Sequence, residues 1–409
     1  MKNNGTSVKI LSSLTQWSLA SLFLFPVFPP KVLNVLFMLF CFFVVLCCIY
    51  IKPRFAWSHI RHNAILLIPF IPYLVEYVTH TNNRMAGFEF EKKLLFFIAP
   101  VVIGLYLSVN KLKDIRIYMY VFVLALFTLT VYSLGMLCHN DMLFSSYGFD
   151  NGARLLRHCF EDATNLPPTY YGLFATVAIL WLVYDFKSQP AKTKIIYIIV
   201  GVLLFFQQLL LAAKMPLIAL LLSLFYLFYK TTEYRKNLWI KYASVITLFA
   251  AIAFLFPSVK NRIMDAESTF TVDSAKHSII VERLVILSCD KDIFSNNVWL
   301  GIGSRNAQGK LNECFTAKGY ADAIPYLFNA HNQFFTLGIN YGIFIMLIFI
   351  TGIISFIVLN RKSPFALVFM LSIVLVMLTE SILERQCGVY FYVLFFLILY
   401  NQQEQEKVI

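Results

Sequence analysis

Hydrophobic residues in this sequence occur in long, nearly uninterrupted runs rather than at the alternating or three-to-four spacing of a soluble core. Runs of this length can cross the roughly 30 Å of hydrocarbon in a bilayer as α-helices. The pattern therefore predicts an all-α polytopic membrane protein with about twelve spans. These spans cover residues 11–28, 32–51, 64–78, 94–109, 115–137, 169–185, 194–213, 215–229, 239–256, 331–359, 364–379 and 387–400.

Polar positions between the spans fix the expected orientation. Lys and Arg residues gather in alternate connections, and short connections rich in these residues stay on the cytoplasmic side of a membrane. Both termini are then expected to be cytoplasmic. The basic residues that define this pattern are Lys2, Lys9, Lys52, Arg54, Arg61, Lys111, Lys113, Arg116, Lys187, Lys192, Lys194, Lys230, Arg235, Lys236, Lys241, Arg361 and Lys362.

Two outer connections, residues 138–168 and 257–330, are too long and too polar to be simple turns. No repeat or linker divides the chain, so we expect one integral membrane domain over residues 1–409. Residues 257–330 then form a large, partly helical outer loop within that domain. The predicted spans carry almost no charge, which disfavours a transporter or proton pump and directs attention to the outer surface.

Composition supports the membrane interpretation and argues against a nucleic-acid-binding protein. Of the 409 residues, 59% are hydrophobic and only 14% are charged, and the mean hydropathy is +0.71. About half of the 34 basic residues lie in the predicted cytoplasmic connections, so the net charge of +12 does not indicate a nucleic-acid partner. Membrane lipids are the expected surroundings of most of the chain.

Five cysteines fall on the predicted outer side: Cys138, Cys159, Cys289, Cys314 and Cys387. An oxidising compartment would allow Cys289 to pair with Cys314, or Cys138 to pair with Cys159. Their spacing matches no pattern of metal ligands.

The large outer loop contains a candidate helix with an arginine. Asp273 is suited to cap a helix that we predict over residues 275–292. Arg283 lies three residues from Ile286 and therefore projects from the apolar face of this helix. Such an arginine either binds an anion, or extends its charge toward the headgroups, or forms a salt bridge with a carboxylate such as Glu282.

Two further segments of the predicted outer side contain candidate binding or catalytic residues. Gly301 and Gly303 permit a tight backbone open to a ligand, although a dinucleotide site is excluded because no strand precedes them and a third glycine is missing. His331 and Asn332 open the span 331–359, where the positive end of the helix dipole attracts anions. An interfacial histidine can equally be an amphipathic anchor.

Lys214 occupies the short outer turn between the spans 194–213 and 215–229, where it is either a headgroup anchor or an anion ligand. Asp290 and Asp292 form an Asp-x-Asp pattern, which in nucleotide-sugar glycosyltransferases holds a metal on the diphosphate. Two residues separated by one position on a helix point to different sides, so we expect no metal here. The other outer carboxylates are weaker candidate bases: Glu89, Glu91, Glu380 and Glu384.

The order of these segments resembles the O-antigen ligase family and its polymerase relatives. The specific part of the resemblance covers residues 282–306 and 331–342, and the topology extends it over most of the chain. The resemblance implies a GT-C-like membrane glycosyltransferase, with Arg283 and His331 as catalytic residues. Lys214 stands where many members of the family carry arginine, which keeps the charge but loses the bidentate geometry of a guanidinium.

By the same resemblance, the substrate-binding residues are expected to be Lys214, Arg305, Asn332 and Glu282. The implied donor is an undecaprenyl-diphosphate-linked O-antigen glycan, and the implied acceptor is the lipid A core. Transfer would occur at the periplasmic face of the bacterial inner membrane, without a metal or cofactor. A glycan polymerase that uses the same donor, and a flippase of lipid-linked glycans, are the alternatives.

Overall fold

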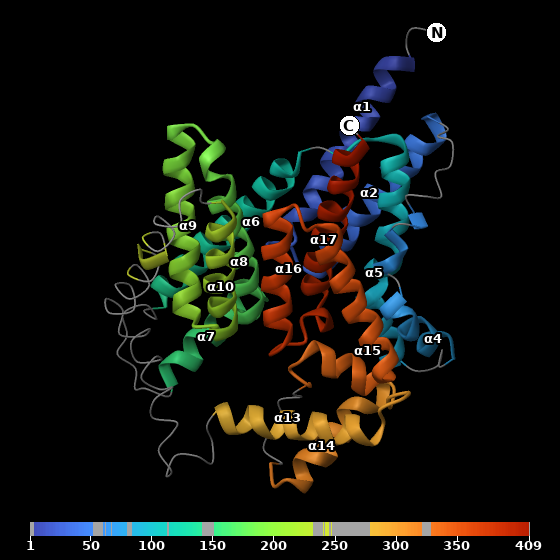
Figure 1. The fold of residues 1–409 in the computed structure, drawn as a ribbon, viewed down its shortest axis with the longest axis vertical. Helices are drawn as coiled ribbons and strands as arrows, with labels where there is room; N and C mark the ends of the chain where they lie inside the picture. Colours follow the sequence, from blue (N-terminus) through green and yellow to red (C-terminus); the bar gives the residue numbers. More distant parts are fainter. Residues whose placement is uncertain are drawn as a thin grey trace.

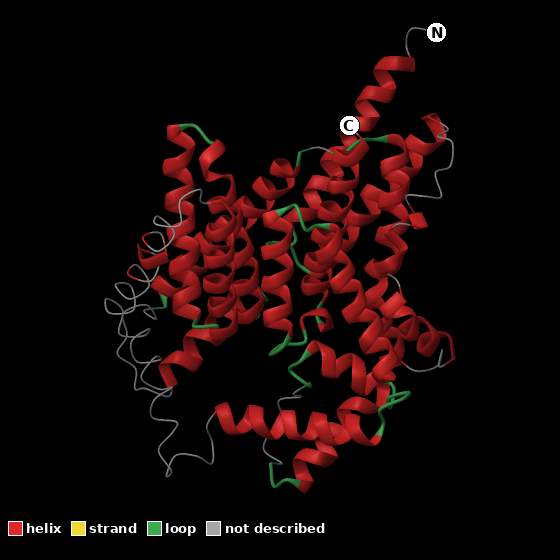
Figure 2. Ribbon diagram, viewed as in Figure 1, coloured by secondary structure: helices red, strands yellow, loops and turns green. Residues whose placement is uncertain are grey.

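The computed structural model describes residues 4–51, 60–61, 63–66, 68–79, 84–112, 114–140, 151–231, 240, 242–244, 247, 279–320 and 329–408. Within these ranges the chain is helical and contains no strand (Figures 1 and 2). The all-α class predicted from the sequence is therefore confirmed for the described part of the protein.

The α-helices are α1 (Asn4–Ser21), α2 (Pro30–Ile51), α4 (Ile71–Thr79), α5 (Arg84–Val109), α6 (Ile115–His139), α7 (Asn151–Thr164), α8 (Pro168–Asp185), α9 (Ala191–Leu211), α10 (Lys214–Thr231), α13 (Ile279–Asn296), α14 (Ser304–Ala317), α15 (Gln333–Leu359), α16 (Pro364–Met377) and α17 (Gln386–Val408). Short 3-10 helices follow α1 (Leu22–Leu24), precede α4 (Ala64–Leu66 and Ile68–Phe70), follow α8 (Phe186–Ser188) and precede α17 (Ile382–Glu384).

Among the described residues, 7 helices are long and apolar enough to cross a membrane. They are α2, α5 from Phe90, α6, α8 with the turn after it, α9, α10 and α15. The predicted spans at 364–379 and 387–400 correspond to α16 and α17, whose apolar parts are shorter. Most of the predicted span 239–256 lies outside the described residues.

The predicted span 64–78 is wrong as a single helix. Its described residues form two 3-10 turns and the short helix α4 instead. Pro69 and Pro72 lie in this stretch, and a proline removes a backbone donor and clashes with the preceding helical turn. The apolar composition suggested a membrane crossing, but the prolines interrupt the helix.

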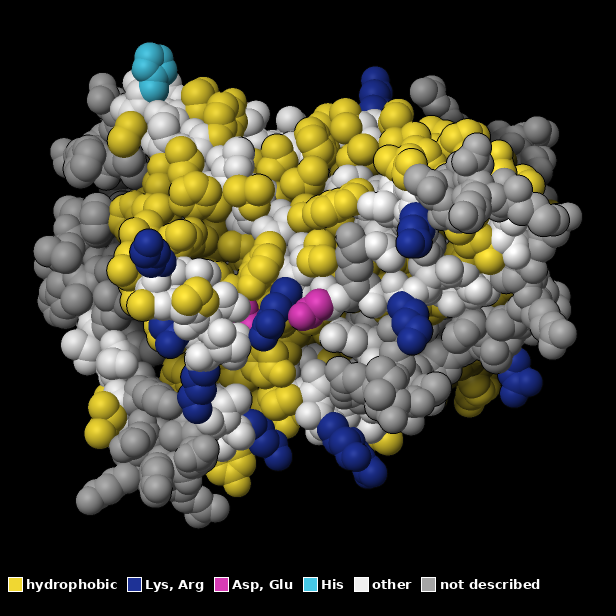
Figure 3. Space-filling model, turned by 90° about the horizontal axis from the view of Figure 1, so that it is seen from above, with side chains coloured by type: hydrophobic (Ala, Val, Ile, Leu, Met, Phe, Trp, Pro, Cys, Tyr) yellow, Lys and Arg dark blue, Asp and Glu magenta, His cyan; other side chains and the backbone are white. Residues whose placement is uncertain are grey.

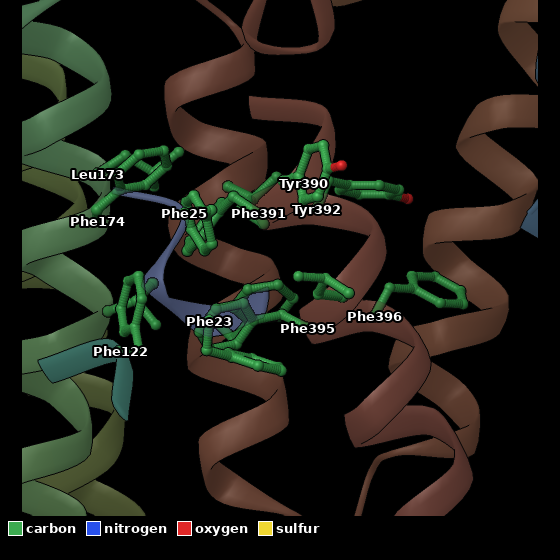
Figure 4. Packing of buried hydrophobic residues seen from close by; sticks show 14 of the residues in the cluster. Phe23, Phe25, Phe122, Leu173, Phe174, Tyr390, Phe391, Tyr392, Phe395 and Phe396 are labelled. Atoms are coloured by element: carbon green, nitrogen blue, oxygen red, sulfur yellow. The ribbon is translucent and has the colours of Figure 1, made fainter. Parts of the chain in front are cut away.

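Aromatic side chains form the centre of the helical bundle (Figure 4). Phe391 of α17 lies 4.6 Å from Phe174 of α8, and Phe395 lies 4.9 Å from Phe122 of α6, measured between ring centroids. Phe25, after α1, meets Phe174 edge-on at 5.2 Å. These contacts bring α6, α8 and α17 together, although they are far apart in the sequence.

The two ends of the bundle differ in character. The start of α1 and the end of α17 lie at one end, whereas α13 and α14 lie at the opposite end (Figure 1). Lys and Arg side chains are spread over the face at the first end, where little Asp or Glu is visible (Figure 3). We call the end that carries α13 and α14 the loop end.

The helix α13 confirms that the large connection is partly helical, but its bounds differ from the prediction. It ends at Asn296 rather than at Asp292, and residues 273–278, which include the predicted cap, lie outside the described residues. A disulfide between Cys289 and Cys314 joins α13 to α14. Of the two pairings considered, the one between Cys138 and Cys159 is wrong, because both of these thiols are unpaired.

Candidate functional site

The candidate site forms around the connection between α16 and α17, residues 378–385, at the loop end (Figure 1). Arg283 of α13 donates from Nη1 to the carbonyl oxygen of Thr379 at 2.7 Å. His331 lies with its Nδ1 3.4 Å from Oε2 of Glu380. The structure therefore brings the two predicted catalytic residues to neighbouring positions of one connection, although 48 positions separate them in the sequence.

The start of α15 places His331. Asn332 is the N-cap of α15, and its Oδ1 accepts hydrogen bonds from the backbone N–H groups of Phe334 at 2.9 Å and Phe335 at 3.1 Å. Its Nδ2 donates to the carbonyl of Leu378 at 3.0 Å. His331 itself has a left-handed backbone with φ of 43°, which only the surrounding contacts can maintain. Asn332 thus fixes the start of α15 and joins it to the connection at Leu378.

Glu380 is largely buried, with 14% of its side chain exposed, against 24% for His331. Burial alone would raise the pKa of Glu380, but the hydrogen bond and charge of His331, together with the charge of Arg283, outweigh it and hold the pKa below its usual value. The carboxyl group is therefore ionised at neutral pH. A hydrogen bond between this carboxylate and Nδ1 of His331 fixes the tautomer of the neutral ring.

A second arginine, Arg157 of α7, belongs to the same electrostatic environment and was missed from the sequence. Burial of its guanidinium lowers the pKa of Arg157, and the nearby charge of Arg283 lowers it further. The negative charges of Glu161 and Glu380 raise this pKa, but they do not outweigh the other two effects. Glu161 also pairs with Arg385 at 3.4 Å. The loop end thus concentrates positive charge around Glu380.

Lys214 is the first residue of α10, at the same end of the molecule as α7 and α13 (Figure 1). Its side chain is exposed, and Thr176 of α8 holds the turn by donating to the carbonyl of Pro216 at 3.0 Å. Within the described residues, no hydrogen bond or ion pair joins Lys214 to Arg283 or His331. The structure therefore places Lys214 at the loop end, but without a direct contact to Arg283 or His331.

The Gly-x-Gly segment has a structural position, and the expectation of a backbone open to a ligand is wrong. Gly301 has φ of 67°, and a Cβ atom there would lie 2.5 Å from the backbone of Asn340 in α15. Ile302 and Gly303 donate their N–H groups to the carbonyls of Ile339 and Asn340 at 2.8 and 2.9 Å. The backbone of this segment is occupied by α15.

Arg305 is separated from Arg283 by the length of α13. Arg283 lies in the first turns of α13 and Arg305 follows its end, and the 13 residues from Arg283 to Asn296 span about 20 Å in a helix. The backbone N–H of Arg305 donates to Oε1 of Glu76 at 3.1 Å, and Ser304 Oγ donates to Oε2 at 2.8 Å. Glu76 of α4 therefore caps α14, a role with no signal in the sequence.

The remaining predicted residues fall into separate environments. The side chain of Glu282 lies outside the described residues. Asp290 is fully buried, and neither of its carboxyl oxygens is hydrogen-bonded. Burial raises the pKa of Asp290 to about 8. Asp292 instead forms a salt bridge with Lys318 at 2.6 Å. The two carboxylates therefore point in different directions, as predicted. In the described ranges, no group of three or more His, Cys, Asp or Glu is placed to hold a metal ion.

Residues 199–350 match the family model described as O-antigen ligase, which is 152 of the 409 residues. The matched range contains Lys214, Arg283 and His331 and ends before Glu380. No curated protein matches the chain. The match confirms the resemblance on which the site residues were predicted.

Proposed function

We propose that the protein transfers a glycan from an undecaprenyl-diphosphate carrier to the lipid A core, on the premise that residues 199–350, which match the O-antigen ligase family model, act as such a domain. The observation that carries the proposal is the convergence of Arg283, His331 and Glu380 on one connection at the loop end. Cationic groups there can receive a diphosphate, and the pair of His331 and Glu380 can handle the proton of an acceptor hydroxyl.

Two independent features support a periplasmic location for this site. Lys and Arg side chains are spread over the opposite end of the protein, where little Asp or Glu is visible, as expected of a cytoplasmic face (Figure 3). The disulfide between Cys289 and Cys314 lies at the loop end, and disulfides persist in oxidising compartments such as the bacterial periplasm. We propose a multi-pass protein of the bacterial inner membrane, with cytoplasmic termini and a periplasmic active site.

The proposed reaction is a displacement at the anomeric carbon of the donor sugar. The acceptor oxygen forms the new bond to this carbon as the bond to the lipid diphosphate breaks, with inversion if both events occur in one step. Negative charge then develops on the leaving diphosphate. Arg283, assisted by Arg157 and Lys214, stabilises this charge, as positioned cations do in other reactions that release phosphate groups.

His331 is proposed to take the proton of the acceptor hydroxyl. With Nδ1 donating to Glu380, the neutral ring accepts a proton at its other nitrogen, Nε2. The ionised carboxylate of Glu380 then stabilises the imidazolium that forms. In this arrangement Glu380 acts through His331 and is a positioning residue.

We propose that this chemistry requires no metal. Arg283 and Arg157 act electrostatically on Glu380, whereas the Asp-x-Asp pair is divided between a buried carboxyl at Asp290 and a salt bridge at Asp292. Charge on the diphosphate is then stabilised by guanidinium and ammonium groups in place of a divalent ion.

The decisive experiment combines purified protein in proteoliposomes with purified lipid-diphosphate-linked glycan and candidate acceptors. Glycan covalently attached to lipid A core supports the proposal. A longer lipid-linked glycan identifies a polymerase instead, and unmodified donor that changes leaflet identifies a flippase. Either of the last two outcomes, without a lipid A product, refutes the proposed function.

A further inference from the structure

Lys93 of α5 is a fully buried lysine inside an apolar helix. Its side chain has 0% exposure, and it lies four positions into the part of α5 that can span a membrane, which begins at Phe90. Burying an ammonium group completely is unfavourable unless it is paired and hydrogen-bonded, so the contacts of this lysine indicate what it is for.

The partners of Lys93 lie in the connection that carries the candidate site. Its Nζ donates to the carbonyl oxygen of Leu383 at 2.5 Å and to Oε1 of Glu384 at 3.1 Å. Tyr73 of α4 completes the environment, with its ring centroid 5.3 Å from Nζ and its hydroxyl 3.4 Å from the same carboxylate oxygen of Glu384. Among the described residues, the hydrogen bonds of the ammonium converge on this one connection, and α4 contributes the aromatic ring beside it.

The opposite side of the connection is held by α15. The backbone N–H of Leu383 donates to Oε1 of Gln333 at 2.7 Å, and the hydroxyls of Thr336 and Ser381 lie 2.7 Å apart. Leu383 therefore has its N–H fixed by α15 and its carbonyl fixed by α5. Glu380 lies three residues away and faces His331, so the position of Glu380 depends on both attachments.

We propose that Lys93 is a positioning residue for the transfer reaction, acting through Leu383 and Glu384 to hold Glu380 against His331. The inference rests on the proposed function. Lys93 has no exposed surface and cannot touch a substrate, so its effect is on the geometry of the connection. Both the charge and the donor groups of the lysine are needed, because without them the Glu384 carboxylate and the Leu383 carbonyl lose a buried partner.

The first test separates catalysis from binding. Lys93→Met preserves the length of the side chain but removes the ammonium, and Lys92→Met makes the same charge change one residue away as a matched control. We expect Lys93→Met to lower kcat about a hundredfold, as displacement of a catalytic group by 1 Å does, with KM for the donor within about twofold. The control should retain the kcat of the wild type.

A second variant covers the case in which Lys93→Met does not fold. The double change Lys93→Met and Glu384→Gln removes both charges, so no buried charge is left unpaired, yet the donor to Leu383 is still missing. We expect this protein to fold and to keep the low kcat. A kcat per folded molecule equal to that of the wild type, in either variant, would overturn the inference.

A cross-linking measurement reports the position of the connection without reference to activity. Cysteines at Thr336 and Ser381 should form a disulfide readily, in a background whose unpaired native cysteines are alanine. Lys93→Met should slow this cross-link, and an unchanged rate would contradict the proposed positioning. If the wild type transfers no glycan, the proposed function fails, while the cross-link still decides whether Lys93 holds the connection.

Discussion

Replacing Arg283 with alanine is the sharpest test of the site. The guanidinium donates to the carbonyl of Thr379 at 2.7 Å, which orients it beside Glu380 and next to His331. A preorganised group that stabilises transition-state charge typically contributes about 2.7 to 4 kcal/mol, so Arg283→Ala should lower the transfer rate roughly a hundred- to thousandfold. If the interaction strengthens only in the transition state, kcat and kcat/KM should fall equally.

The assay is glycan transfer from purified lipid-diphosphate donor, normalised to the amount of folded protein. Arg283→Lys should recover only part of the rate, because one ammonium group cannot contact both the Thr379 carbonyl and a diphosphate with the geometry of a guanidinium. Lys310→Ala is a matched control, since Lys310 is an exposed cation of the same loop paired with Glu313. An Arg283→Ala protein within about threefold of the wild type would show that this arginine is a structural or headgroup contact.

Four other predictions concern the charge, pH dependence, metal requirement and orientation of the site. Glu380→Gln should lower kcat about 10- to 150-fold, because a charged hydrogen bond to His331 contributes roughly 1.5 to 3 kcal/mol; an unchanged kcat would remove Glu380 from the site. The stability of the wild type should fall as pH rises from about 4 to about 8, since folded Asp290 keeps its proton up to a pKa of about 8 while the unfolded chain loses it near 3.8. Asp290→Asn should lack this dependence, and parallel thermal-unfolding curves for the two proteins would contradict the reasoning. Transfer should survive excess chelator, whereas loss that is restored by a divalent cation would reveal a metal site. A cysteine at position 310 should react with an impermeant reagent added from the periplasmic side and one at position 192 should not, and reversed labelling would invert the proposed orientation.

The sequence predicts features that depend on local pattern. Apolar runs that are long enough to cross a bilayer as helices predict the all-α membrane class. The pattern of the loop also predicts α13, whose end lies four residues beyond the predicted end at Asp292. Arg283 on an apolar helix face and His331 at the start of a span are candidates from local pattern, and the family resemblance then implies catalytic roles for both. Asn332 before an apolar run is a cap signal, and the structure shows it capping α15.

Contacts between residues that are far apart in the sequence cannot be predicted from local sequence patterns. Glu380 was only one of several outer carboxylates until the structure placed it beside His331, 49 positions earlier in the chain. Lys93 and its partner Glu384 are separated by 291 positions, and the predicted span 94–109 left Lys93 outside the membrane. The Gly-x-Gly segment was misread because a tight backbone favours close approach by any group, and here that group is α15.

Backbone hydrogen bonds attach the segment between α13 and α14 to the long apolar helix α15. The backbone of α15 opens at Gly342, where φ is 80°, and Ile343 donates its N–H to the carbonyl of Val298 at 2.7 Å. The opened turn of a membrane helix therefore finds its hydrogen bonds in the segment between α13 and α14. Because α13 runs directly into this segment and its Phe294 packs against Phe335 of α15, the helix that carries Arg283 and the helix that begins after His331 are held together at both places.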